Sequence, residues 1–383
     1  MKHTPFRIDI PEQDLADLRQ RLAGTRWSAD VSPAWEDGTS SRTLRNVVEY
    51  WQRDFDWRAA ERRLNALPQF IAEVDGQAIH YIHAKGAGSG SVPLVITHGW
   101  PGSFVEMVKI LPMLTHPEQN GFPGRRSFDV VVPSLPGFGF SAAPTEPGMN
   151  SRKVAGLWHQ LMRGLDYHSY FAQGGDIGSG VSTWLARLYP HAVRGLHLNF
   201  MSASYQPPLS EKDRPLSKVE SDWIAYRTQW AQAEGGYSHI QATKPQTLAH
   251  ALVDSPSGLA AWLLEKFHAW SDGEGELGEK HDLDELLTNV CVYWFSRNVG
   301  ATLRIYKENA AKPLAFAHGE RIEVPLNYAV FPKEIITPPR EWVERVFDVA
   351  RWTVMPVGGH FAAFEQPRLL AKDIHDSFGS IAL

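Results

Sequence analysis

The chain has 383 residues, of which 43% are hydrophobic, enough for a large core and for one elaborated domain or two modest ones. Its formal net charge of −5 gives no field that would attract nucleic acid or an anionic membrane, so we expect neither as a partner. Cys291 is the only cysteine, which excludes an intramolecular disulfide and a cysteine-based zinc site and favours a reducing compartment.

The sequence shows no targeting or membrane-spanning pattern. Its first residues run directly into charged, periodic sequence and do not resemble a signal peptide. No segment reaches the roughly 18 to 20 apolar residues that a membrane helix needs. We therefore expect a cytoplasmic protein that is not anchored to a membrane.

The first region, residues 1–90, is expected to contain helices and one hairpin. A helix is predicted over Pro11–Leu22, because a proline at its start is followed by leucines that share one face. A second helix is predicted over Leu44–Phe55, where apolar residues recur at helical spacing. The pair Asp75–Gly76 between two apolar runs predicts a β-hairpin. We expect both helices to pack on the domain that follows.

Residues 91–205 alternate apolar strands with helices, which is typical of a parallel sheet with right-handed crossovers. The predicted strands are Leu94–Thr97, Phe128–Val132 and Tyr170–Gln173. The predicted helices are Val105–Leu114, Val154–Leu165 and Val181–Leu188.

The strand pattern stops in residues 206–310, a Trp-rich helical segment in which Trp223, Tyr226 and Trp230 share one stripe. It resumes in residues 311–383. The strands predicted there are Leu326–Phe331 and Trp352–Val357, each followed by a helix. The sequence therefore predicts an α/β fold whose sheet is interrupted by a helical insertion and then completed.

The most informative stretch is Gly174-Gly175-Asp176-Ile177-Gly178, which follows an apolar strand and precedes a helix. Small residues on both sides of one functional residue are what a strained strand-to-helix turn needs, because larger side chains would collide with the neighbouring backbone. The pattern predicts a nucleophile elbow with Asp176 in the position that a serine usually takes. The alternative is that Asp176 only caps a helix beside ordinary glycines.

A second turn, His98-Gly99-Trp100-Pro101-Gly102, also comes directly after a strand. It resembles the loop that supplies half of the oxyanion hole in α/β-hydrolases, with the backbone N–H of Trp100 as one donor and that of Ile177 as the other. Taken by itself, the same turn could be purely structural.

His360 lies between the last apolar strand and the C-terminal helix, with two glycines before it. An α/β-hydrolase carries its catalytic histidine at this point, after the nucleophile and the acid in chain order. Glu334, which closes the preceding strand, is the predicted acid partner that fixes the imidazole tautomer. The alternatives are that Glu334 is an ordinary acid at a helix N-terminus, or that the less well-placed Asp348 is the partner.

With the motifs His-Gly-Trp-Pro-Gly-Ser, Gly-Gly-Asp-Ile-Gly-Ser and Gly-Gly-His-Phe-Ala-Ala-Phe-Glu in this order, the chain resembles the microsomal and juvenile-hormone type of epoxide hydrolase. The resemblance covers nearly the whole chain and implies an α/β-hydrolase fold with a helical lid at 206–310 and an N-terminal meander at 1–90. Two lid segments match the tyrosine segments of that family, so Tyr237 and Tyr306 are implied to donate to the epoxide oxygen. Without the resemblance they would be assigned as half-buried lid residues.

An epoxide needs a nucleophile behind one carbon and proton donors at the ring oxygen. Asp176 would form a covalent ester, and His360, held by Glu334, would activate the water that hydrolyses this ester to a vicinal diol. We expect no cofactor and no metal. His-Glu-x-x-His is absent, and Asp272–Glu276 lacks the spacing of a calcium loop, so we expect that segment to be a solvated lid loop.

Two other functions stay open on these residues. A haloalkane or haloacid dehalogenase also uses an aspartate nucleophile, although it often has a tryptophan directly after it, where this chain has Ile177. A catalytically silent ligand-binding protein on the same fold is the second alternative. Lid tryptophans such as Trp270 suggest a bulky apolar or aryl epoxide as the small-molecule substrate, and a homodimer stays open.

Overall fold

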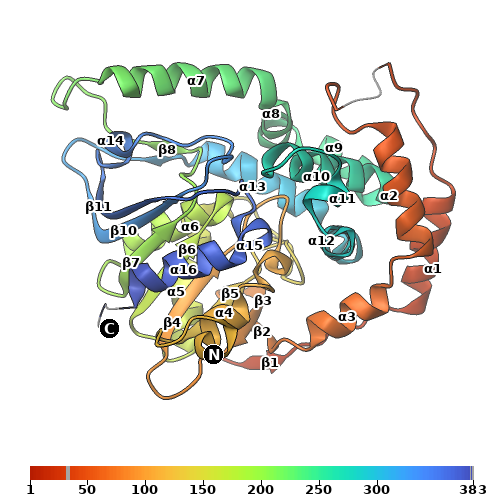
Figure 1. Ribbon diagram of the computed structural model, residues 1–383, viewed down its shortest axis with the longest axis horizontal. Coiled ribbons are helices and arrows are strands. Elements are labelled where there is room, and N and C mark those ends of the chain that lie inside the picture. The colour runs from red at the N-terminus through yellow and green to blue at the C-terminus, as the bar shows by residue number, and fades with distance from the viewer. Residues whose placement is uncertain (32–34, 380, 382–383) are drawn as a thin grey trace.

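The computed structural model describes residues 1–31, 35–379 and 381, and within them nine strands form one sheet (Figure 1). The strands are β1 (His3–Pro5), β2 (Gln69–Val74), β3 (Gln77–Ala84), β4 (Val92–Thr97), β5 (Phe128–Pro133), β6 (Tyr170–Gly174), β7 (Val193–Leu198), β10 (Ile322–Val330) and β11 (Phe347–Val354). Their order is β1-β2-β3-β5-β4-β6-β7-β10-β11. The strands from β5 to β11 pair in parallel, whereas β1, β2 and β3 pair antiparallel. The predicted mostly parallel sheet is therefore confirmed.

The central strands β4, β5 and β6 are buried along their whole length, which explains their continuous apolar sequence. Helices flank the sheet (Figure 1). They are η1 (Phe104–Met107), α4 (Leu111–Thr115), η2 (Pro117–Asn120), α5 (Ser151–Gly164), α6 (Asp176–Leu188), α14 (Arg340–Val343), α15 (Ala362–Glu365) and α16 (Pro367–Phe378).

Two helix predictions for this region are corrected. The single helix predicted over Val105–Leu114 is two short helices, η1 and α4, because Pro112 can stand only in the first turn of a helix. The helix predicted over Val181–Leu188 begins earlier, at Asp176. Gly178 and Gly180, which were expected to be turn residues, lie in the first two turns of α6.

The helical insertion forms a lid beside the sheet (Figure 1). Its helices are α7 (Lys218–Glu234), α8 (Gly236–Thr243), α9 (Pro245–Asp254), α10 (Pro256–Trp270), α11 (Leu277–Lys280), α12 (Leu283–Ser296) and α13 (Val299–Ala311). The short strands β8 (Tyr205–Gln206) and β9 (Leu314–Ala315) pair in parallel where the chain leaves and re-enters the core. The predicted stripe on α7 is not buried as one face, because Tyr226 is 53% exposed.

The N-terminal helices α1 (Glu12–Ala23), α2 (Ser41–Arg53) and α3 (Trp57–Asn65) pack against lid helices α10 and α12. The ring of Trp57 lies 4.9 Å from that of Phe295, and the Tyr50 hydroxyl donates to Asp284 Oδ1 at 2.9 Å. The prediction that these helices pack on the core domain directly is therefore wrong. Of the described residues in this region, only the hairpin β2–β3 and strand β1 join the sheet, and the helices extend outward to the lid.

The described residues, 1–31, 35–379 and 381, contain no helix that is both long and apolar enough to cross a membrane. The boundaries predicted at residues 90, 205 and 310 stay predictions. The pairing of β8 with β9 brings the two ends of the lid segment together at the edge of the core.

Candidate active site

Asp176 lies at a sharp turn between β6 and α6. Its backbone has a φ of 44°, in the left-handed region that residues other than glycine rarely adopt. A Cβ atom on Gly178 would lie 1.9 Å from the carbonyl oxygen of Thr97, and one on Gly174 would lie 2.2 Å from the carbonyl oxygen of Gly178. Bare backbone at both positions therefore lets α6 start directly against β4, which is the geometry expected of a nucleophile elbow.

The Asp176 carboxylate is held by the turn that follows β4. The backbone N–H of Trp100 donates to Asp176 Oδ1 at 2.8 Å. A Cβ on Gly99 would lie 2.2 Å from the same oxygen, so only glycine leaves room for the carboxylate. Ile177 is the second residue of α6, and its N–H has no acceptor within the helix because of its position in the first turn. The predicted pair of amide donors thus belongs to two segments that meet at Asp176.

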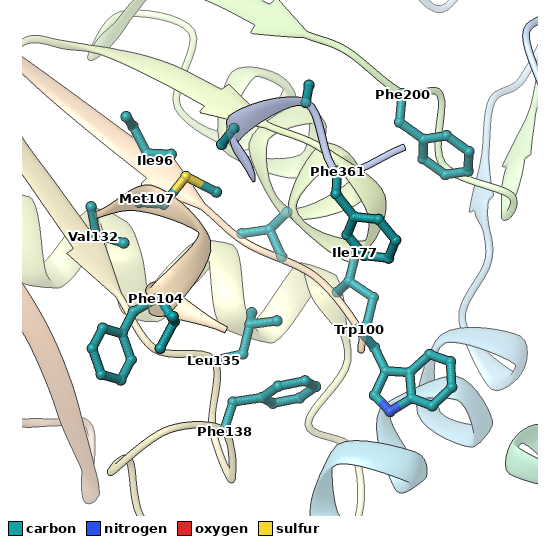
Figure 2. Packing of buried hydrophobic residues seen from close by; sticks show 14 of the residues in the cluster. Ile96, Trp100, Phe104, Met107, Val132, Leu135, Phe138, Ile177, Phe200 and Phe361 are labelled. Carbon is teal, nitrogen blue, oxygen red and sulfur yellow. The ribbon is translucent and has the colours of Figure 1, made fainter. Parts of the chain in front are cut away.

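Apolar side chains surround this turn. Trp100 is completely buried, and Ile177 and Phe361 belong to the same hydrophobic core (Figure 2). The ring of Phe200 stands edge-on to the imidazole of His360, with 5.4 Å between ring centres. Such surroundings keep the local dielectric low, which strengthens every interaction between charges in the site.

Glu334, His360 and Asp176 form one chain of contacts. His360 Nδ1 lies 2.6 Å from Glu334 Oε1, and His360 Nε2 lies 3.5 Å from Asp176 Oδ2. The side chains of His360 and Glu334 are 3% and 1% exposed. A parallel bridge between Lys333 and Gly359 aligns the loops that follow β10 and β11, which brings the two residues together. The rival acid, Asp348, is exposed on β11.

The imidazole of His360 lies between the carboxylates of Glu334 and Asp176, which govern its pKa. Burial by itself would lower its pKa, because a buried cation loses its hydration. The carboxylates of Glu334 and Asp176 outweigh that effect and raise the pKa of His360 well above its usual value. The protonation of His360 therefore depends on the negative charge of Asp176.

Tyr237 in α8 and Tyr306 in α13 face each other beside Trp100. Their ring centres are 6.0 Å apart, Tyr237 stacks on Trp100 at 5.4 Å, and Tyr306 meets Trp100 edge-on at 5.8 Å. Burial raises the pKa of both phenols, and the charge of Asp176 raises both further. Both tyrosines are therefore protonated near neutral pH. The ammonium of Lys266 lies 4.6 Å from the ring centre of Tyr237.

The lid also contacts His360 directly, through residues outside the predicted site. The backbone N–H of His360 donates to the carbonyl oxygen of Trp270 at 2.9 Å. The rings of the two residues meet edge-on, with 5.1 Å between ring centres. Asp272 Oδ2 accepts the N–H of Gly358 at 2.8 Å. The prediction of a solvated loop is therefore wrong for Asp272, which is half-buried and joins the lid to the His360 loop.

Glu365 completes this connection between lid and core. Its Oε2 accepts the N–H groups of Asp272 at 2.7 Å and Gly359 at 3.0 Å, while Oε1 accepts the N–H of Phe361 at 2.9 Å. Burial raises its pKa to about 7, although these amides oppose the shift. Glu365 ends the motif Gly-Gly-His-Phe-Ala-Ala-Phe-Glu, so its place in the motif was a signal for a role beside His360.

Among the residues that the structure describes, no group of three or more His, Cys, Asp or Glu side chains is arranged to hold a metal ion. The site geometry is instead that of a carboxylate, an imidazole and two phenols. These groups can supply a nucleophile, a base and proton donors.

Comparison with known proteins identifies the family. A model of the epoxide hydrolase N terminus matches residues 3–107, and a model of the alpha/beta hydrolase fold matches residues 92–233. The chain is 38% identical to epoxide hydrolase 1 of Oryctolagus cuniculus, over 97% of this chain and 87% of that protein. The chain belongs to the epoxide hydrolases.

Solved structures agree with this assignment. The juvenile hormone epoxide hydrolase of Bombyx mori superposes on the enzyme with a TM-score of 0.87 and 28% identity, over 99% of this chain and 94% of that one. The epoxide hydrolase of Aspergillus niger gives a TM-score of 0.84 and 31% identity, over 98% and 96%. The predicted α/β-hydrolase fold and the resemblance to the microsomal and juvenile-hormone type are thus confirmed. These similarities favour epoxide hydrolase activity over the dehalogenase and ligand-binding alternatives.

The turn at Asp176 predicts a specific effect of Gly178→Ala. The added methyl group would overlap the carbonyl oxygen of Thr97, so we expect the free energy of unfolding to fall by at least about 2 kcal/mol, with loss of diol formation. Urea denaturation and an epoxide assay measure the two effects. Gly90→Ala is the control, because its Cβ meets nothing within 4 Å. Equal stability and activity in the two variants would contradict the packing argument.

Proposed function

We propose that the enzyme opens its epoxide through a covalent ester on Asp176. Because Asp176 Oδ1 accepts the Trp100 N–H, Oδ2 is the oxygen left to attack a ring carbon from behind. The bond between that carbon and the ring oxygen breaks as the new carbon–Oδ2 bond forms. The ring oxygen takes a proton from Tyr237 or Tyr306 and becomes the first hydroxyl of the product.

Ester formation also changes the state of His360. The negative charge of Asp176 disappears when the ester forms, so the pKa of His360 falls and its proton becomes available to restore the phenol. The imidazole is then a neutral base at the time when a base is needed. Glu334 keeps Nδ1 protonated and Nε2 free, which is the tautomer that this step requires.

The second step is hydrolysis of the ester. A water molecule gives a proton to His360 Nε2 and bonds to Cγ of Asp176, and the displaced electron pair goes to Oδ1, where the N–H groups of Trp100 and Ile177 stabilise it. Collapse of this intermediate breaks the bond between Cγ and Oδ2, and the leaving oxygen takes the proton from His360. A vicinal diol leaves with the former Oδ2 of Asp176, and the remaining water proton returns to His360.

The single observation that carries this proposal is the 3.5 Å separation of His360 Nε2 from Asp176 Oδ2, together with the elbow that presents the carboxylate. For the substrate we propose an apolar or aryl epoxide. The support is the rings of Trp100 and Trp270, each within 5.4 Å of the Tyr237 ring. The other lid tryptophans give weaker support for an apolar substrate. The indole N–H of Trp262, for example, donates a hydrogen bond to Gln241 Oε1 within the lid.

His360→Gln is predicted to trap the ester. Without the base, hydrolysis should slow at least about 10²-fold while alkylation continues, because Asp176 needs no base to attack. Incubation with styrene oxide, an aryl epoxide, followed by peptide mass analysis should find one substrate mass added to the peptide that carries Asp176.

The control for this experiment is the double variant Asp176→Ala/His360→Gln, which should gain no mass. A His360→Gln enzyme that neither turns over nor carries the added mass, while it still binds the epoxide, would argue against a covalent route.

The tyrosines are predicted to act in the first step alone. Replacement of both Tyr237 and Tyr306 by phenylalanine should slow alkylation about 10²-fold or more, because the ring oxygen then leaves without a proton donor. Ester hydrolysis should keep its rate, since the phenols take no part in that step. Rapid-quench kinetics separates the two rates. Equal slowing of both steps would contradict the role assigned to the pair.

A further inference from the structure

The reacting groups line a small cavity. It leaves about 20 Å³ for the centre of a water molecule, which is space on the order of one water. Its lining includes the polar side chains of Asp176, His360, Asn199 and Glu106, together with those of Thr97, His98 and Gln173. The first two are the groups between which the hydrolytic water must stand. The mechanism above gives Glu106 no function.

The Glu106 carboxyl group is free to bind a ligand in the cavity. Glu106 is 9% exposed and lines the cavity, and no hydrogen bond joins its carboxyl group to another of the described residues. Its oxygens are not among the fully enclosed polar atoms that lack a partner, so they face the open space of the cavity. A water molecule in the cavity would supply its missing partner.

Gly102 leaves the space in which the Glu106 carboxyl lies. A Cβ atom at position 102 would come within 1.5 Å of Glu106 Oε1. The backbone of Gly102 is not in the left-handed region, so glycine is needed there for space and not for conformation. The motif His-Gly-Trp-Pro-Gly-Ser thus contains one glycine that makes room for Asp176 and a second that makes room for Glu106.

The lid holds this turn in position. The Tyr293 hydroxyl donates to the carbonyl oxygen of Gly102 at 2.7 Å, and Asn289 Nδ2 donates to that of Pro101 at 2.9 Å. The Ser103 hydroxyl donates to Asn289 Oδ1 at 2.7 Å. The segment that precedes Glu106 is therefore fixed by α12, which makes the carboxyl a preorganised group.

We propose that the buried carboxyl group of Glu106 binds the water that hydrolyses the Asp176 ester. This inference rests on the proposed ester mechanism. The water would donate one hydrogen to a Glu106 oxygen and the other to His360 Nε2, which aims an oxygen lone pair at Cγ of Asp176. His360 removes its proton as before, and Glu106 gains and loses none. Asn199 stands at the same cavity and can contact the same water.

The protonation state of Glu106 fits this function. Burial raises its pKa to about 8, the positive charge of His360 opposes the shift, and the charges of Asp176 and Glu365 add to it. Near neutral pH the group is therefore mostly a neutral acid, which accepts a hydrogen bond without competing with His360 for the proton. An ionised Glu106 would also repel the negative charge of Asp176, which the neutral acid does not do.

The test measures alkylation and ester hydrolysis separately in three variants. Glu106→Leu should slow hydrolysis at least about 10-fold and leave alkylation within about three-fold, because one hydrogen bond to the water is lost. Glu106→Gln is the matched control, since its amide keeps a neutral acceptor, and should hydrolyse the ester within about three-fold of the normal rate. Gly102→Ala should reproduce Glu106→Leu, because its methyl group displaces the carboxyl group.

The outcomes distinguish this inference from the mechanism on which it rests. Normal ester hydrolysis in either Glu106→Leu or Gly102→Ala would overturn the inference and leave the ester mechanism intact. Slow hydrolysis in Glu106→Gln, equal to that in Glu106→Leu, would contradict a neutral hydrogen-bonding function. If His360→Gln forms no ester, it is the mechanism that fails. Gly102→Ala keeps the test decisive if Glu106→Leu does not fold.

Discussion

The site depends on one backbone constraint, the left-handed conformation of Asp176 at the end of β6. Such a conformation costs on the order of 1–3 kcal/mol and persists only where its surroundings hold it. Here the glycines at 174 and 178 let α6 approach β4, and the Trp100 N–H binds the carboxylate. The strain has a use, because it lifts the carboxylate out of the sheet towards the tyrosines of the lid. The close packing of α6 against β4 therefore determines where the Asp176 carboxylate stands.

Charge links the two steps that we propose. While Asp176 is negative, the two carboxylates raise the pKa of His360 and favour its protonated form, which cannot act as a base. When the ester forms, one of those charges disappears and the imidazole becomes able to accept a proton. The charges of a buried, largely apolar site therefore set the order of events. Glu365 and Asp272 accept hydrogen bonds from the backbone of the His360 loop, which hold this loop in place while the charge of the imidazole changes.

The sequence predicted the parts of the site that chain order determines. Parallel strands end at one edge of a sheet, so motifs after β4, β6, β10 and β11 had to meet, and Asp176, Trp100, Glu334 and His360 do meet. It could not predict contacts between elements far apart in the chain. Asp272 was expected to lie in a solvated lid loop, yet it binds the His360 loop. Glu106 was hidden in a region assigned to one regular helix, and the tyrosines carried no local signal beyond the family resemblance.

The most direct test of the ester mechanism follows the oxygen atoms. With enzyme in excess over epoxide, a single turnover in water labelled with the heavy oxygen isotope should release an unlabelled diol, because the second hydroxyl comes from Asp176. The label should appear instead in the Asp176 side chain, and later turnovers should release labelled diol. Solvent oxygen in the diol of the first turnover would contradict the covalent ester, since water would then have attacked the epoxide itself.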